Sequence, residues 1–190
     1  MNLGGGFLFL FDTIVDLYLS IVIARFVLQM VRADFYNPLS QLIVKATSPL
    51  LMPFRKIVPG FGGVDIACIV LFLVLVLIKL ILIGFLFGVE LFLTSALVYL
   101  FFLAAVNAVL NFFFFVIIIN FILSWVQPGG YHPIANAIVQ MASPLLTPAR
   151  RFIPPLGMLD ISPMVVILLI YFTKIIFRLD TTDKIIASFF

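Results

Sequence analysis

One stretch of the sequence occurs twice, at a constant spacing of 95 residues. Residues 36–66 align without a gap with residues 131–161, and 14 of these 31 aligned positions are identical, including four pairs of prolines. A repeat of this kind means that one structural unit is present twice, so the two halves should share a fold. We predict two tandem repeats, residues 1–95 and 96–190.

Apolar stretches flank the repeated segment in both halves. The chain is 65% apolar and 10% charged, whereas about a quarter of the residues in a soluble domain are charged. With so few charged residues, a soluble domain could not cover its core with a polar shell, so the surrounding solvent should be lipid. We expect an all-α polytopic membrane protein with transmembrane helices at about residues 7–32, 65–87, 98–126 and 161–179, the last of them near the short limit for a span.

The basic residues indicate the orientation of these helices. Lys and Arg are concentrated in the two connecting loops and are absent from the N-terminal segment and from the linker between the repeats. By the positive-inside rule both loops should be cytoplasmic, which makes the repeats parallel and places the termini in the periplasm of a bacterial inner membrane. For residues 86–97 the sequence leaves two alternatives, a re-entrant segment and an interfacial segment. A separate span there would put the loops on opposite sides, and the charges argue against it.

Each loop should contain a short amphipathic helix that lies in the membrane surface. In the first loop Leu39, Leu42, Ile43, Ala46 and Leu50 recur at helical spacing, and the second loop repeats the pattern. Pro38 and Pro133 suit a first helical turn, and the later prolines should break the rest of each loop into short turns. Asp65 and Asp160 are placed to cap the next spanning helix.

Two basic pairs come after these helices, Arg55 with Lys56 and Arg150 with Arg151. At headgroup depth they would contact anionic lipid headgroups, and a docking surface for a membrane-protein partner or a second copy of the chain is the alternative. Nucleic acid is excluded as a partner because the net charge of +3 is spread over short loops.

Ionisable side chains inside the spans are candidate functional residues, because each costs about 2.5 to 3.5 kcal/mol near the bilayer centre. They fall at equivalent positions of the repeats. We expect one polar cluster between the repeats, made of Asp12, Asp16, Lys79, Asn107, Asn111 and Lys174. It would be a structural cluster or a cation pathway. Two acids against two lysines leave little charge for a guest ion, which favours the structural interpretation. Arg25 should extend toward the headgroups.

Catalytic chemistry has no support in the sequence. The chain has one histidine, His132, and one cysteine, Cys68, which stands in an apolar run. No nucleophile motif, phosphate-binding glycine loop or metal-ligand spacing accompanies them. We therefore predict no enzyme activity, no cofactor and no metal site.

The repeated loop, F-Y-N-P-L-S-Q…S-P-L-L-x-P-x-R-[KR]-x-[IV]-P…G-x-x-D-I, resembles that of the YggT family of bacterial inner-membrane proteins. The second copy departs from it at residues 129–132. The resemblance implies a small four-helix membrane protein without known catalysis. It also implies links to osmotic and potassium tolerance, to cell division in Gram-positive bacteria, and to cytochrome assembly and nucleoid distribution in plastids. Two functions remain open: a scaffold or assembly factor with a role in membrane or osmotic homeostasis, and a potassium, cation or small-solute transporter or channel.

Overall fold

The computed structural model describes residues 3–60, 63–87, 95–126, 132–153, 160–177 and 179. Within them the chain forms helices and no strand, which confirms the expected all-α class. The helices are α1 (Leu3–Met30), α2 (Pro38–Ile57), α3 (Ile66–Phe87), α4 (Ser95–Val126), α5 (Pro133–Phe152) and α6 (Ser162–Ile176). Most of the linker in which a re-entrant or interfacial segment was considered, residues 88–94, lies outside the described residues.

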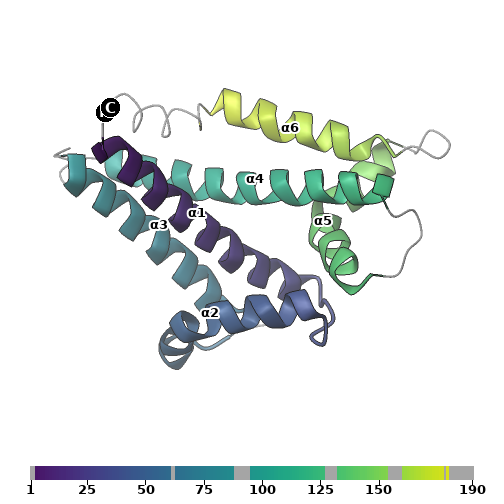
Figure 1. Cartoon of the computed structure of the whole chain (residues 1–190), viewed down its shortest axis with the longest axis horizontal. Coiled ribbons are helices and arrows are strands. Elements are labelled where there is room, and N and C mark those ends of the chain that lie inside the picture. Colours follow the sequence, from purple (N-terminus) through teal and green to yellow (C-terminus); the bar gives the residue numbers. More distant parts are fainter. Residues whose placement is uncertain are drawn as a thin grey trace.

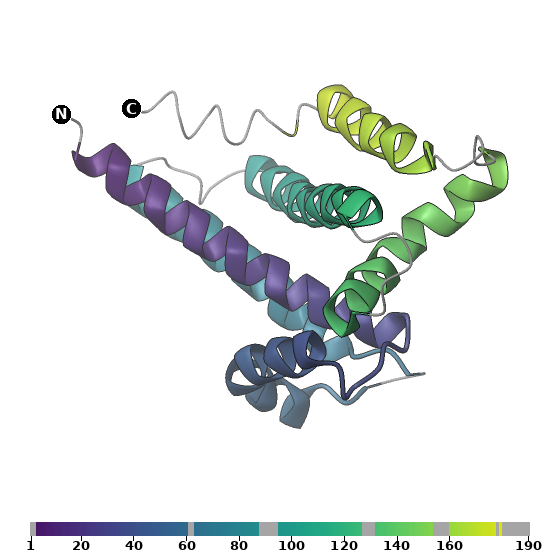
Figure 2. The same ribbon diagram turned by 45° about the vertical axis from the view of Figure 1, so that its right-hand side comes forward.

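The two halves build equivalent three-helix units. In the first, α1 packs against α3, and α2 contacts both; in the second, α4 packs against α6, and α5 contacts both. Figure 1 shows α2 across the end of the α1–α3 pair and α5 at the end where α4 finishes. Figure 2 shows the same relationship from another side. The duplication in the sequence is thus a duplication of one helical hairpin with a helical connector.

The units meet through contacts of α1 and α3 with α4, and of α5 with α1 and α2. The larger apolar core draws residues from all helices except α3, with Ile117, Ala142 and Leu146 at its centre. A smaller core joins α1, α2 and α3 around Leu51 and Leu71. Both repeats therefore contribute to one body.

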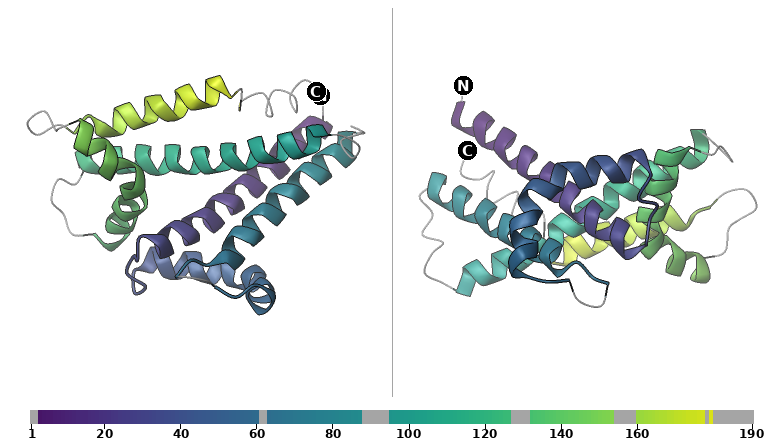
Figure 3. Two further views of the ribbon diagram at one scale, coloured as in Figure 1. Left: turned by 180° about the vertical axis from the view of Figure 1, so that it is seen from behind. Right: turned by 90° about the horizontal axis from the view of Figure 1, so that it is seen from below.

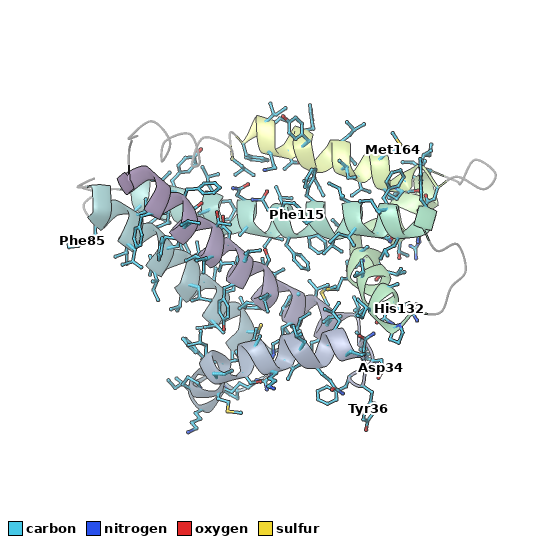
Figure 4. The ribbon with its side chains drawn as sticks, in the orientation of Figure 1. Asp34, Tyr36, Phe85, Phe115, His132 and Met164 are labelled. Atoms are coloured by element: carbon cyan, nitrogen blue, oxygen red, sulfur yellow. The ribbon has the colours of Figure 1, made fainter. Side chains whose placement is uncertain are left out.

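Much of the apolar surface faces outward. Two segments, Ile66–Phe85 and Leu97–Trp125, are long and apolar enough to cross a membrane, yet only 33% and 28% of them is buried. Figure 4 shows Phe85 and Met164 projecting from the outer edges of their helices. A soluble protein buries such helices, so their exposure indicates a membrane protein. Of the other two expected spans, α6 has 15 residues, fewer than a typical span, and α1 carries Asp12, Asp16 and Arg25.

The connectors differ from the expectation that proline would break them. Both α2 and α5 are continuous helices of 20 residues with two prolines inside, and α2 bends along its length (Figure 3). Proline leaves the carbonyl four residues earlier without its usual partner. In α5 the Oγ of Ser143 donates to the carbonyl of Gln140, the group that Pro144 leaves unbonded, at 2.7 Å. A neighbouring hydroxyl thus supports the helix across the proline.

One face of α2 is buried against the other helices, and the placement of its apolar side in the membrane surface stays a prediction. Its buried residues are Ser40, Ile43, Thr47 and Leu51, while Leu42 and Leu50 are exposed. The side of α2 that faces α1 is partly polar, and part of its apolar side is uncovered. A hydrogen bond from Arg25 on α1 reaches Thr47.

Candidate functional site

A lysine on α3 joins two carboxylates on α1. The Nζ of Lys79 lies 2.8 Å from Oδ1 of Asp12 and 2.5 Å from Oδ1 of Asp16. The two acids stand one helical turn apart, so they present their carboxylates to the same side of α1. The Lys79 side chain is only 12% exposed. One ammonium group therefore contacts two carboxylates between the first pair of helices and balances one of their two charges.

The second repeat makes the equivalent contact without the acids. The Nζ of Lys174 on α6 donates to Oδ1 of Asn111 on α4 at 2.9 Å. Asn107, one turn earlier, is buried, and its Oδ1 has no hydrogen-bond partner among the described residues. Each lysine thus binds the first helix of its own repeat.

A small cavity links the two sets of polar groups. It measures about 30 Å³ and lies between α1, α3 and α4, with Asp16, Lys79, Asn107 and Asn111 as its polar lining. That volume accommodates a water molecule. Lys174 joins this group through Asn111, and Asp12 joins it through Lys79. The structure therefore brings the six polar residues together at the boundary of the repeats; a functional role for them stays a prediction.

Arg25 does not extend toward the surface as expected. It is 7% exposed and points at α2, where its Nη1 donates to the Val44 carbonyl at 3.1 Å, to Thr47 Oγ1 at 2.5 Å and to Ser48 Oγ at 3.2 Å. These acceptors explain why Thr47 lies on the buried face of α2. Sequence periodicity missed this contact because it weighs hydropathy within one helix only.

The first arginine of each basic pair, Arg55 or Arg150, forms an ion pair within the protein. Arg55 forms an ion pair with Asp65, in which its Nε lies 3.1 Å from Oδ2, and Arg150 Nε donates to Asp160 Oδ2 at 2.8 Å. Neither ion pair was predicted from the sequence. The signal was present, because an arginine precedes an aspartate by 10 residues in both copies. The neighbouring Lys56 and Arg151 are exposed.

The two aspartates also contact the start of the following helix, in different ways. Asp65 Oδ1 accepts the Cys68 N–H at 3.3 Å. Asp160 Oδ1 accepts the Ser162 N–H at 2.9 Å, but the N-cap residue of α6 is Ile161. Partial burial raises the pKa of Asp160, yet hydrogen bonds from Ser162 and Arg150 outweigh it, so the pKa of this carboxyl lies below its usual value.

An asparagine connects the two loops. Asn37 caps α2, because its Oδ1 accepts the Leu39 N–H at 2.9 Å, and its Nδ2 donates to the carbonyl of Pro133 at the start of α5. The equivalent His132 makes no side-chain cap for α5. Figure 4 shows His132 near Asp34 and Tyr36, at the junction of the repeats. The departure of the second copy from the first at this position therefore has a structural effect. Residues 129–131 of the same departure lie outside the described residues.

Comparison with known proteins gives the family. The family described as CCB3/YggT matches residues 5–86 and 97–179. The chain belongs to this family. The chain is 47% identical to an uncharacterized protein of Pseudomonas aeruginosa over 83% of its own length and 80% of the relative's. It is 37% identical to the protein YggT of Escherichia coli K12, also uncharacterized, over 86% and 84% of the two chains. No solved structure matches.

The two matched segments of this CCB3/YggT chain each contain one helical hairpin and its connector. The family match confirms the resemblance to the YggT family that the repeated loop indicated. Because these relatives carry no described activity, membership of the CCB3/YggT family fixes the kind of protein and leaves its function to be argued from the residues.

Proposed function

We propose that the chain is a non-enzymatic integral membrane protein of the bacterial inner membrane, a scaffold or assembly factor with a role in membrane or osmotic homeostasis. In this arrangement α1, α3, α4 and α6 span the bilayer as two parallel hairpins, and α2 and α5 lie at the cytoplasmic surface. The loops contact anionic headgroups and a partner membrane protein or a second copy of the chain.

The surface of the connectors carries this proposal. Next to the exposed cations Lys56 and Arg151 stand Ile57 and Phe152, which occupy equivalent positions and are 80% and 85% exposed. A cation beside an uncovered apolar side chain fits the boundary between headgroups and hydrocarbon, or a partner's surface at that depth. Figure 1 shows that α1 and α4 start on the same side of the molecule and both run toward the other side, as parallel hairpins require.

Cross-linking tests the scaffold role. A photoreactive residue placed at position 56 or 151 in cells should cross-link to the same membrane protein. One placed at position 85, which is exposed near the C-terminal end of α3, should not. Lys56→Ser combined with Arg151→Ser should remove the product. A different set of products from each position, with no common partner, would contradict the proposal.

Passage of a cation or small solute is the second candidate. The observation that favours it is the unpartnered Oδ1 of Asn107 in a cavity that also holds Asp16 and Lys79. The pairing of Lys79 with both acids opposes it, because the ammonium occupies Oδ1 of each carboxylate and balances one of their two charges. Potassium flux into liposomes that contain the purified chain decides between the two. Selective flux abolished by Asp12→Asn with Asp16→Asn would reverse our order, and absence of flux together with partner capture supports the scaffold.

A further inference from the structure

A second cavity, of about 450 Å³, lies between the C-terminal part of α1 and the connector α2. Its volume is within the range of pockets that bind small molecules. Its polar lining consists of three arginines, two serines and a glutamine: Arg25, Arg32, Arg55, Ser40, Ser48 and Gln29. No carboxylate lines it. The side chains therefore offer a dense set of hydrogen-bond donors and positive charge to an anion.

No acid among the described residues forms an ion pair with Arg25, and Asp65, whose charge acts on it, is itself bound to Arg55. The guanidinium is protonated at all relevant pH values, it is 7% exposed, and all the acceptors it reaches are neutral oxygens. Neither Arg25 nor Arg32 makes an ion pair within the described residues, while Arg55 has Asp65. A buried charge without a counter-charge is costly, and an anion in the cavity would remove that cost.

A buried hydroxyl adds an independent observation. Ser40 is 5% exposed and lines the same cavity, and its Oγ has no hydrogen-bond partner among the described residues. Buried hydroxyl groups normally have a partner. An anion beside the arginines would accept this hydrogen bond.

Arg32 occupies a backbone position that favours glycine. It follows α1 with φ at +53°, and the bonds from Arg32 N to the Gln29 carbonyl and from Ala33 N to the Leu28 carbonyl form the motif in which glycine usually ends a helix. A side chain in this conformation costs stability. A ligand bound by the guanidinium would explain why an arginine stands at this strained position in the lining of a cationic cavity.

The second repeat lacks the site. Asn120, Gln127 and Ala135 stand where the first repeat has Arg25, Arg32 and Ser40. Helices α4 and α5 nevertheless pack together as α1 and α2 do. The arginines are therefore not required to hold a connector on its spanning helix, and their presence in one repeat calls for another role.

We propose that this cavity binds a phosphate group, held by Arg25, Arg32 and Arg55 with Ser40 as the hydroxyl donor. Guanidinium groups match phosphate oxygens in charge and geometry. Two sources supply this chemistry: the headgroup of an anionic phospholipid and a soluble phosphate. The site does not depend on the scaffold role, since it requires no partner protein.

The test uses the purified chain in four forms: wild type, Arg32→Gly, Ser40→Ala and the control Lys56→Ser. Binding of inorganic phosphate is measured by calorimetry, and binding of phosphatidylglycerol by native mass spectrometry. We expect one saturable site, bound at least about tenfold more weakly by Arg32→Gly, more weakly by Ser40→Ala, and unchanged in Lys56→Ser. Phosphate binding in water identifies a soluble ligand, and binding of the lipid alone identifies a headgroup.

Thermal unfolding separates binding from folding. Arg32→Gly should unfold at the same or a higher temperature than wild type, because glycine relieves the left-handed position. A loss of binding with intact stability supports the site. Absence of saturable binding of both probes, or an equal loss in Arg32→Gly and Lys56→Ser, would overturn it.

Discussion

Lys174 donates from its Nζ to Oδ1 of Asn111, and this contact is the counterpart of the one between Lys79 and Asp16 in the first repeat. Both pairs are 63 residues apart and join the first and third helices of one repeat. The acceptor is an amide in one repeat and a carboxylate in the other. An amide oxygen is therefore sufficient for the lysine to bind across the hairpin.

Asp16→Asn should accordingly be tolerated. The substitution keeps an oxygen acceptor for Lys79, and Asp12 still supplies a charge at 2.8 Å. We expect the free energy of unfolding to fall by about 1 kcal/mol or less. Unfolding of the purified chain in detergent micelles measures it. A loss of several kcal/mol would mean that the hairpin needs both carboxylates.

Lys79→Met should be much more damaging than Lys174→Met. Removal of Lys79 leaves two acids without their described partner, at a cost of about 3 to 5 kcal/mol, while removal of Lys174 takes the lysine donor from Asn111, a neutral amide, at about 1 to 3 kcal/mol. Adding Asp12→Asn and Asp16→Asn to Lys79→Met should restore part of the lost stability. Equal effects of the two lysine substitutions, without rescue, would contradict the pairing of Lys79 with both acids.

The two connector ion pairs should differ in their contribution to stability. Asp65 is 5% exposed and its equivalent Asp160 is 30% exposed. Asp65→Asn removes a buried carboxylate from Arg55, whose side chain is 47% exposed, and should cost about 1.5 to 3 kcal/mol. Asp160→Asn breaks a more exposed pair and should cost about 1 kcal/mol. Unfolding of both variants beside wild type measures the difference, and the opposite order would show that burial does not determine these contributions.

At low pH, protonation of Asp160 should remove its contribution to the stability of the folded chain. Its pKa is lower in the folded chain than in the unfolded chain, so the unfolded state binds the proton more readily. The stabilisation is complete above the unfolded pKa, about 3.9, and is lost as the pH falls through the lower folded pKa. The difference in melting temperature between wild type and Asp160→Asn should be constant at pH 5 to 7 and shrink below about pH 4. A difference that grows with acid would contradict the direction of the shift.

The sequence predicted the helices and the polar positions because both follow from local pattern. The spacing of apolar residues defines a helix wherever it lies, and the equivalence of Lys79 with Lys174 indicated that polarity at this depth has a structural reason. The same reasoning placed Asp16 and Lys79 in one polar cluster, and the structure pairs them.

The contacts made by Arg25 and by the connectors depend on tertiary structure. Hydropathy alone defined the apolar side of α2, which includes Leu42, but the burial of Thr47 depends on the guanidinium of Arg25 on another helix. Proline rules predicted a break at Pro144, and the hydroxyl of Ser143 compensates for it. Such partners become visible only when the helices are packed together.

Cysteine labelling in intact cells tests the parallel arrangement most directly. In a Cys68→Ala background, single cysteines replace Lys56 and Arg151, which are exposed at equivalent positions of the two connectors, and Phe7, which is exposed near the start of α1, serves as the control. A membrane-impermeant reagent should label position 7 from outside and reach positions 56 and 151 only after the membrane is opened. Labelling of 56 and 151 from opposite sides would contradict two hairpins inserted in the same sense.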